Sequence, residues 1–411
     1  MASLLLAIIY LAFISLGLPD ALLGSAWPYM YQQFDVPLSY AGLISMIISL
    51  GTVVSALMSD RLTRRLGTGL VTTISVAMTA VALLGFSVSS AYWMLLLWAI
   101  PYGLGAGSVD ASLNNYVALH YASRHMSWLH AMWGVGISIG PYIMSYALTH
   151  GAIWNSGYRT VFILQVVLTT ILILSLPLWK KRPSAPANAS GQKQEGEDLP
   201  AEEETSPIEK AEETAGTKPL TLRQILSLPG AMAILIAFFC YSAVEQTTIL
   251  WGSSFLVLSK GVSADLAASF ASMFCIGITI GRIICGFLTL RFNDTQMIRL
   301  GALLITLGVV FLFLPFGPVF SVVGLMIVGF GCAPIYPCII HSTPAHFGAE
   351  NSQAVIGIQM AFGYIGTTLM PPLFGLIANH ISITLFPAYL LIFLVLLAFM
   401  YEIVVRKTEK A

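Results

Sequence analysis

The sequence has few charged residues. Of its 411 residues only 9% are Asp, Glu, Lys or Arg, while 57% are hydrophobic; an average soluble domain has about 25% charged residues. Fifteen of the charged side chains are concentrated in residues 180–220, so the other 370 residues carry only 23. The water-facing surface of a globule needs more charge than this. The composition therefore disfavours secreted enzymes, nucleic-acid-binding proteins and soluble cofactor enzymes, and most of the chain is expected to face a lipid bilayer.

Other chemical signatures are also missing. The five cysteines all fall inside apolar stretches, which favours reduced core residues over a disulfide framework or a zinc site. The sequence shows no phosphate-binding loop, metal-ligand spacing or nucleophile triad. We therefore expect no enzyme activity, no cofactor and no metal. ATP-driven pumping is disfavoured for the same reason, which leaves a solute or ion gradient as the source of work.

What the sequence has instead is long hydrophobic runs. A membrane helix needs about 20 mostly apolar residues, and hydropathy predicts twelve such spans. The predicted fold is an all-α integral membrane protein with two six-helix halves, residues 1–179 and 229–411. A cytoplasmic linker, residues 180–228, joins them and is expected to be largely disordered, because it is polar and contains no aromatics. The predicted spans are 3–32, 38–60, 68–88, 91–119, 127–151, 157–178, 229–258, 263–290, 297–315, 318–341, 351–377 and 383–405.

The distribution of Lys and Arg predicts the orientation. If both termini are cytoplasmic, sixteen of the nineteen basic residues lie on the cytoplasmic side. Only Arg159 and Lys260 then lie outside, and Arg282 lies within a span. This asymmetry follows the positive-inside rule. We expect a protein of the plasma (inner) membrane with both termini in the cytoplasm.

The two halves also resemble each other in sequence. Small residues recur at a nearly constant offset of 226 to 230 positions, which indicates an internal duplication. The matching pairs are Gly51 to Arg61 with Gly281 to Arg291, Gly103 to Ala106 with Gly329 to Cys332, and Trp133-Gly134 with Phe362-Gly363.

The sequence resembles the Major Facilitator Superfamily. The loop after the second span is similar to that family's Gly-x-x-x-Asp-Arg-x-x-Arg-Arg signature, carried here by Asp60, Arg61, Arg64 and Arg65, with Ala56 in place of the first Gly. The resemblance covers the chain outside the linker and implies two parallel six-span halves. It also implies that these four residues latch the outward-open state. Positive-inside topology alone is the other explanation for the arginines.

A narrower resemblance is to the sugar transporters of the fucose–proton symporter-like branch. Members of that branch place one carboxylate in span one and one in span four, and the corresponding residues are Asp20 and Asp110. The polar pair Asn114-Asn115 and the run from His130 to Pro141 are similar to the same branch. The resemblance implies symport of a sugar with protons.

Four ionisable residues lie inside predicted spans: Asp20, Asp110, Glu245 and Arg282. A charged group at the bilayer centre costs at least about 2.5 kcal/mol, so such residues indicate function. Asp20 follows Pro19, which loosens the helix, and shares a helical face with Trp27. An acid beside an aromatic ring suits a sugar. Alternatively, Asp20 bonds the backbone that Pro19 disturbs and Trp27 is an interfacial anchor.

The remaining candidates are also open to two interpretations. Asp110 and Asn114 stand one turn apart, and proton occupancy of the acid would change its hydrogen bonding; an interhelical clamp is the alternative. Glu245 is expected to bind solute, carry a proton or gate the outer mouth, with a structural role as the alternative. Arg282 is expected to neutralise a buried carboxylate or contact solute, with a structural ion pair as the alternative. The lower-ranked candidates, which could equally bond across helices, are Gln359 and His130.

The sequence thus favours a secondary transporter that takes up a sugar or similar polar solute with protons, with sodium as a possible alternative ion. Its expected partners are a small-molecule solute, the coupling ion and the lipid bilayer, and not nucleic acid; we expect a monomer. The alternative function is proton-linked efflux of amphipathic molecules by antiport. A third possibility, a non-transporting receptor, would be expected to carry an extra folded domain.

Overall fold

The computed structural model describes residues 2–121, 123–150, 153–179, 222–289 and 291–408. These residues are helical apart from short turns, and no strand occurs among them. The helices are α1 (Ala2–Gly17), α2 (Leu22–Gln33), α3 (Tyr40–Leu66), α4 (Thr68–Val88), α5 (Tyr92–His120), α6 (Ser123–Thr149), α7 (Trp154–Trp179), α9 (Leu222–Ser227), α10 (Ala231–Lys260), α11 (Ala264–Leu288), α12 (Asp294–Phe313), α13 (Pro318–Phe347), α14 (Ala349–Ile377), η1 (Ala378–Ser382), η2 (Ile383–Leu385) and α15 (Phe386–Thr408).

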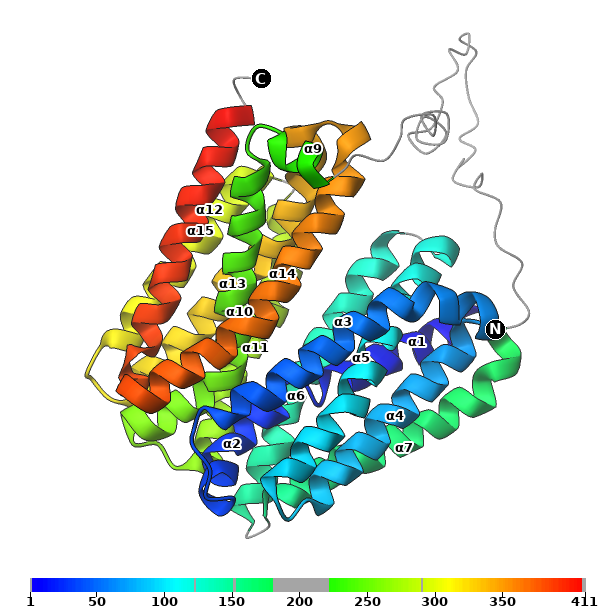
Figure 1. Cartoon of the computed structure of the whole chain (residues 1–411), viewed down its shortest axis with the longest axis vertical. Helices are drawn as coiled ribbons and strands as arrows, with labels where there is room; N and C mark the ends of the chain where they lie inside the picture. The colour runs from blue at the N-terminus through cyan, green and yellow to red at the C-terminus, as the bar shows by residue number, and fades with distance from the viewer. Residues whose placement is uncertain (1, 122, 151–152, 180–221, 290, 409–411) are drawn as a thin grey trace.

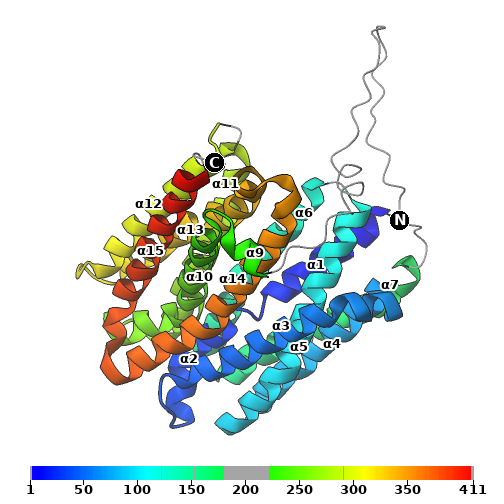
Figure 2. The ribbon, with the colours of Figure 1, turned by 45° about the horizontal axis from the view of Figure 1, so that its top comes forward.

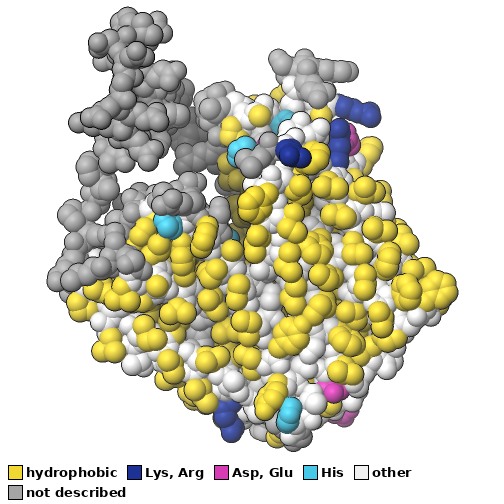
Figure 3. Space-filling model, turned by 180° about the vertical axis from the view of Figure 1, so that it is seen from behind, with side chains coloured by type: hydrophobic (Ala, Val, Ile, Leu, Met, Phe, Trp, Pro, Cys, Tyr) yellow, Lys and Arg dark blue, Asp and Glu magenta, His cyan; other side chains and the backbone are white. Residues whose placement is uncertain are grey.

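The protein is an integral membrane protein. Ten helical stretches among the described residues are long and apolar enough to cross a bilayer, and one of them, Val355–Thr408, includes both α14 and α15. With α6 added and the pair α1–α2 counted once, the described helices form the twelve predicted spans. Figure 3 shows hydrophobic side chains across the middle of one face, with the charged side chains visible there near its two ends.

The spans form two bundles of six, as predicted. The N-terminal half contains α1–α7 and the C-terminal half contains α10–α15. Figures 1 and 2 show the bundles meeting near α2 and diverging toward the ends that carry the N- and C-termini. We call this the termini side. The predicted linker lies mostly outside the described residues, but its last part forms the short helix α9.

Four pairs of helices join the halves, α6–α11, α3–α14, α2–α10 and α2–α11, and the contacts of the first three lie away from the termini side. Between α6 and α11, the Ser145 hydroxyl donates to the Asp265 carbonyl at 2.6 Å. Between α3 and α14, a Cβ at Gly42 would lie 2.6 Å from Pro372 Cα. Between α2 and α10, a Cβ at Gly24 would collide with the Ile249 carbonyl. Small residues let the backbones approach this closely.

The predicted duplication corresponds to matching helix pairs. In the N-terminal half, a Cβ at Gly103 of α5 would collide with the Ile48 carbonyl of α3. In the C-terminal half, a Cβ at Gly329 of α13 would collide with the Phe274 carbonyl of α11. The α6–α11 and α3–α14 contacts are equivalent in the same way, because each joins span five of one half to span two of the other.

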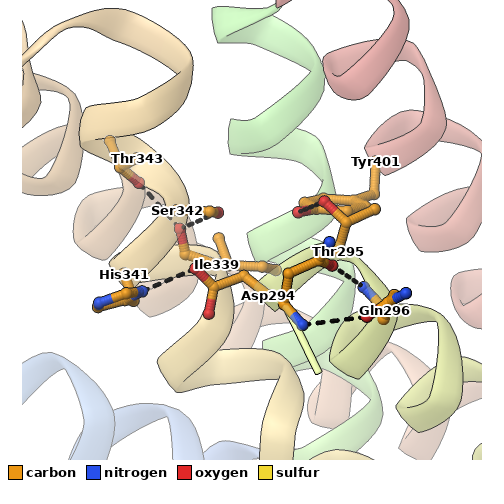
Figure 4. Close-up of polar contacts among 9 residues, drawn as sticks. Asp294, Thr295, Gln296, Ile339, His341, Ser342, Thr343 and Tyr401 are labelled. Carbon is orange, nitrogen blue, oxygen red and sulfur yellow. Dashed lines mark hydrogen bonds and ion pairs between the residues drawn. The ribbon is translucent and has the colours of Figure 1, made fainter. Parts of the chain in front are cut away.

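A polar cluster ties α12, α13 and α15 together on the termini side (Figure 4). His341 Nδ1 lies 2.7 Å from Asp294 Oδ2, and the Thr295 and Tyr401 hydroxyls are 3.4 Å apart. Asn293 and Gln296 form a capping box that starts α12. This cluster fixes the ends of helices and lies apart from the cavity described below.

Candidate functional site

The first span is broken at its centre. Helix α1 ends at Gly17 and α2 begins at Leu22, with turns between them. Pro19 lies in this break and has no backbone N–H to continue the helix, so the prediction that it loosens the span is confirmed. A bilayer does not hydrate free backbone groups, so such a break needs protein or a cavity around it. Asp20 lies within the break, in the interior of the N-terminal half.

Both carboxylate oxygens of Asp20 accept hydrogen bonds from side chains of other helices. The Tyr102 hydroxyl on α5 donates to Oδ1 at 3.2 Å. The Trp133 indole Nε1 on α6 donates to Oδ2 at 2.8 Å. Among the described residues, these side chains bond the carboxylate, and the backbone freed by Pro19 does not. These contacts fix the Asp20 carboxylate as a binding group would be fixed. They do not support the alternative that Asp20 bonds the backbone that Pro19 disturbs.

A cavity of about 270 Å³ lies beside the break, between the two halves. It is concave and mostly apolar with a few polar groups, as small-molecule sites usually are. Asp20 is the one charged side chain among the described residues that line it. The N-terminal half contributes Pro19, Asp20, Leu23, Ser45, Ile48, Ser49, Thr52, Leu83, Phe86, Tyr102, Trp133, Ile137 and Tyr158, and the C-terminal half contributes Gln246, Ile249, Leu250, Tyr364 and Thr367.

Six of the polar lining residues have no hydrogen-bond partner among the described residues. Three are in the N-terminal half and three in the C-terminal half: Ser45, Ser49, Tyr158, Gln246, Tyr364 and Thr367. Hydroxyl and amide groups both donate and accept. The cavity therefore offers neutral hydrogen-bonding groups from both halves around one carboxylate.

A second ionisable group belongs to the C-terminal half. The Tyr241 hydroxyl donates to Glu245 Oε1 at 2.9 Å, and Arg282 Nη2 lies 3.7 Å from the same oxygen. The Arg282 guanidinium also lies over the Trp133 ring, 5.4 Å from its centroid. Of the roles predicted for Arg282, this geometry fits neutralisation of a buried carboxylate or a structural ion pair, and Arg282 is not among the described residues that line the cavity.

Asp110 does not line the cavity. It accepts a hydrogen bond from Asn114 Nδ2 at 2.9 Å, one turn further along α5. The Asn114 Oδ1 atom is buried and has no partner among the described residues. Asp110 is eight residues from Tyr102, so it lies about 12 Å further toward the termini side. The two predicted acids are therefore at different depths.

Other predicted site residues lie elsewhere. Trp27 is fully buried and its Nε1 donates to the Leu38 carbonyl at 2.8 Å. Gln359 is fully buried and pairs with Thr343 of α13. His130 packs edge-on against Phe13, with ring centroids 5.9 Å apart. None of the three is among the described residues that line the cavity.

The predicted latch residues occupy the last turns of α3, on the termini side. The Arg65 side chain is exposed. The side chains of Asp60, Arg61 and Arg64 lie outside the described part of the structure, so their latch role stays a prediction.

Sequence reasoning missed several lining residues. Ser45, Ser49 and Thr52 are spaced by four and three positions, which puts three hydroxyls on one face of an otherwise apolar helix. That spacing was available as a signal. No comparable local signal marks Tyr102 or Trp133, whose roles come from contacts with Asp20 over 82 and 113 positions.

The arrangement can bind a neutral polar molecule and hold a proton on a carboxylate. A protonated carboxyl can donate as well as accept, whereas a carboxylate only accepts. The described residues contain no group of three or more His, Cys, Asp and Glu side chains that could hold a metal ion.

Comparisons with known proteins agree with this architecture. A family model described as Major Facilitator Superfamily matches residues 9–350 and 259–411. "Bypass of stop codon protein 6" of Saccharomyces cerevisiae is 23% identical over 91% of this chain and 77% of its own. The glucose/mannose transporter GlcP of Bacillus subtilis is 22% identical over 80% of this chain and 77% of its own. The solved structure of the nucleoside transporter NupG is 14% identical and superposes with a TM-score of 0.73 over 97% of this chain and 98% of that one.

Proposed function

Because the chain belongs to the Major Facilitator Superfamily of membrane transporters, we propose that it takes up a neutral sugar or similar polyhydroxylated solute together with protons. The observation that carries this proposal is the set of six unpaired polar side chains around the cavity. A polyol has hydroxyls that both donate and accept, so it matches Ser, Thr, Tyr and Gln side chains. The Trp133 and Tyr364 rings suit the apolar face of a sugar.

The charge of the cavity supports a neutral solute. Asp20 is the one charged side chain among its described lining residues, and Arg282 is already paired with Glu245. An anionic solute would meet a carboxylate without a free cation beside it. The similarity to a glucose/mannose transporter is in line with a sugar. The narrower resemblance to the fucose–proton symporter-like branch stays a prediction.

Asp20 is our candidate for the coupling proton. It is the one carboxyl group among the described residues that line the cavity. Loading a proton would remove its charge and add a donor. The halves would then rock about the site by alternating access. The same carboxylate could bind sodium in place of a proton, and antiport could use the same groups. The transport experiment below therefore decides the coupling ion and the direction of transport.

We also propose that the protein lies in the plasma (inner) membrane with its termini in the cytoplasm. On the described part of the termini side, exposed basic residues include Arg65, Arg223, Arg291, Arg406 and Lys407. The opposite side carries Arg159 and Lys260. The positive-inside rule supports this orientation.

The solute class is tested on the purified full-length protein. A ligand that binds the folded state alone raises its unfolding temperature. We expect stabilisation by neutral sugars or sugar alcohols from a panel that also contains aromatic acids and amphipathic cations. Stabilisation by amphipathic cations alone would support efflux instead.

The coupling is tested in proteoliposomes with the stabilising sugar. Asp20→Asn keeps the shape of the side chain, but an amide does not take up a proton at the pH of the assay. We expect it to lose accumulation above the external concentration under an inward proton gradient, while counterflow exchange continues. If Asp20→Asn still accumulates the sugar, proton coupling through Asp20 is wrong.

A further inference from the structure

Trp133 contacts ionisable groups of both halves. Its indole N–H donates to Asp20 at 2.8 Å, and its ring faces the Arg282 guanidinium at 5.4 Å. Arg282 in turn lies 3.7 Å from Glu245, which accepts a hydrogen bond from Tyr241. A continuous row of contacts therefore runs from the acid of the N-terminal half to the acid of the C-terminal half.

We infer that Trp133 is a positioning residue that transmits the charge state of Asp20 to the Arg282–Glu245 pair. This inference rests on the proposed function, because it takes Asp20 as the proton site. Two different parts of the Trp133 side chain take part in this transmission. The indole N–H group responds to the charge of Asp20, and the face of the ring interacts with Arg282.

The first step concerns the hydrogen bond. A bond to an ionised carboxylate is roughly twice as strong as a bond between neutral groups. When Asp20 takes up a proton, the indole therefore loses a strong acceptor. The indole N–H has no second acceptor among the described residues, so the ring becomes freer to move.

The second step concerns Arg282. A guanidinium within about 6 Å of an indole centroid is held by the negative face of the ring. Movement of the ring removes this attraction and leaves Glu245 as the partner of Arg282 in the described structure. Protonation of Asp20 in the N-terminal half therefore changes the contacts of Arg282 in the C-terminal half.

The third step concerns the interface between the halves. One residue from Trp133, a Cβ at Gly134 would lie 2.7 Å from Thr279 Oγ1, and Ser138 Oγ lies 3.3 Å from the same oxygen. The α6–α11 interface is therefore close-packed where Trp133 and Arg282 meet. Rocking of the halves must shift this interface, so the position of Trp133 biases the rocking equilibrium.

Other titratable groups surround this row. The groups that interact with Asp20 or Arg282 from the packed helices are Tyr102 and Asp110 of α5, His130 of α6, Tyr241 and Glu245 of α10, Cys275 and Cys285 of α11, and Cys332 and Tyr336 of α13. The test therefore includes an Asp20 variant, which separates the response of Asp20 from theirs.

The experiment measures the opening of the termini side without any solute. Trp128→Cys on α6 and Phe287→Cys on α11 place spin labels on two exposed positions in the full-length protein, with the half-buried Cys285 replaced by Ser. The inter-label distance is measured in lipid nanodiscs between about pH 5 and pH 8. We expect the distance distribution to shift with pH, and Trp133→Phe, which keeps a ring but removes the N–H, to lose that shift.

Controls separate the possible failures. Trp154→Phe also removes a buried indole donor, whose partner is the neutral Gln33 side chain, and should keep the wild-type shift. Arg282→Gln should lose the shift and Arg282→Lys should keep it, which provides a second readout if Trp133→Phe does not fold.

If Asp20→Asn abolishes the shift but Trp133→Phe and Arg282→Gln retain it, the inference about Trp133 is wrong and the proposed function stands. If Asp20→Asn retains the shift, or the wild type shows none, the proposed proton site is wrong.

Discussion

At the scale of single residues, Asp20 and Asp110 are distinguished by their neighbours. The sequence presents both as acids inside membrane spans and predicts similar roles for them. The structure pairs Asp20 with Tyr102 and Trp133 at the cavity, and Asp110 with Asn114 outside it. Sequence spacing can show that Asp110 and Asn114 are one turn apart. It cannot show which side chains of other helices reach Asp20.

This difference leads to a prediction for Asp110→Asn. If Asp110 also carries a coupling proton, the variant should lose accumulation of the sugar against its gradient. Its affinity for the sugar should stay within about twofold of the wild type, because a residue outside the cavity does not contribute binding contacts. Counterflow exchange and equilibrium binding measure the two quantities separately. Asp294→Asn, an acid of the polar cluster on α12, is the control and should accumulate the sugar normally; normal accumulation by Asp110→Asn as well would show that Asp110 is structural.

At the scale of helices, hydropathy predicted where most spans lie but not how far they extend. Helix α13 was expected to end at residue 341 and continues to Phe347. The added turns contain His341, Ser342, Thr343 and His346. Hydropathy falls where a helix leaves the bilayer, although the helix itself continues. The break in the first span was foreseen because proline acts locally on its own helix.

The positions of glycines in the sequence do not show which of them pack closely against another helix. The sequence contains 35 glycines, and only the helix crossings decide which of them need to lack a Cβ. At Gly136 on α6, a Cβ would collide with the Ile14 carbonyl of α1, whereas a Cβ at Gly286 on α11 meets nothing within 4 Å.

Alanine at these two positions should therefore have opposite effects. Gly136→Ala is expected to destabilise the protein by about 1–3 kcal/mol, the usual cost of overpacking. Gly286→Ala should leave stability unchanged or raise it by up to about 1 kcal/mol, because alanine favours helix more than glycine does. The unfolding temperatures of the two variants in the same detergent measure this difference. Equal temperatures would mean that the α1–α6 crossing adapts to the added methyl group.

At the scale of the whole molecule, the sequence predicted two six-helix halves and their duplication, and the structure has both. It did not predict which helices join the halves, because the register between distant helices depends on small residues that are common throughout the chain. The described contacts join α2 to α10 and α11, α3 to α14 and α6 to α11, and those seen in detail lie away from the termini side. The termini side is therefore the more open side in this structure.

A cross-link between the halves should stop transport. Ser138 and Thr279 lie on α6 and α11 with their hydroxyl oxygens 3.3 Å apart, so Ser138→Cys and Thr279→Cys would place two thiols next to each other across the interface. Oxidation of the double variant should abolish counterflow of the sugar, and reduction should restore it. Each single variant under the same oxidant is the control. Unchanged counterflow in the cross-linked protein would mean that α6 and α11 do not separate during the transport cycle.

The location of Trp133 gives the protein a built-in optical signal. It is the one tryptophan among the described residues that line the cavity, and its indole lies between a carboxylate and a guanidinium. The emission of an indole depends on the charges and the water around it, so a solute entering the cavity would change the fluorescence of the unlabelled protein. Subtracting the spectrum of Trp133→Phe isolates that contribution from the other seven tryptophans. Candidate solutes can then be ranked on the unlabelled protein by the change in Trp133 fluorescence that each of them causes.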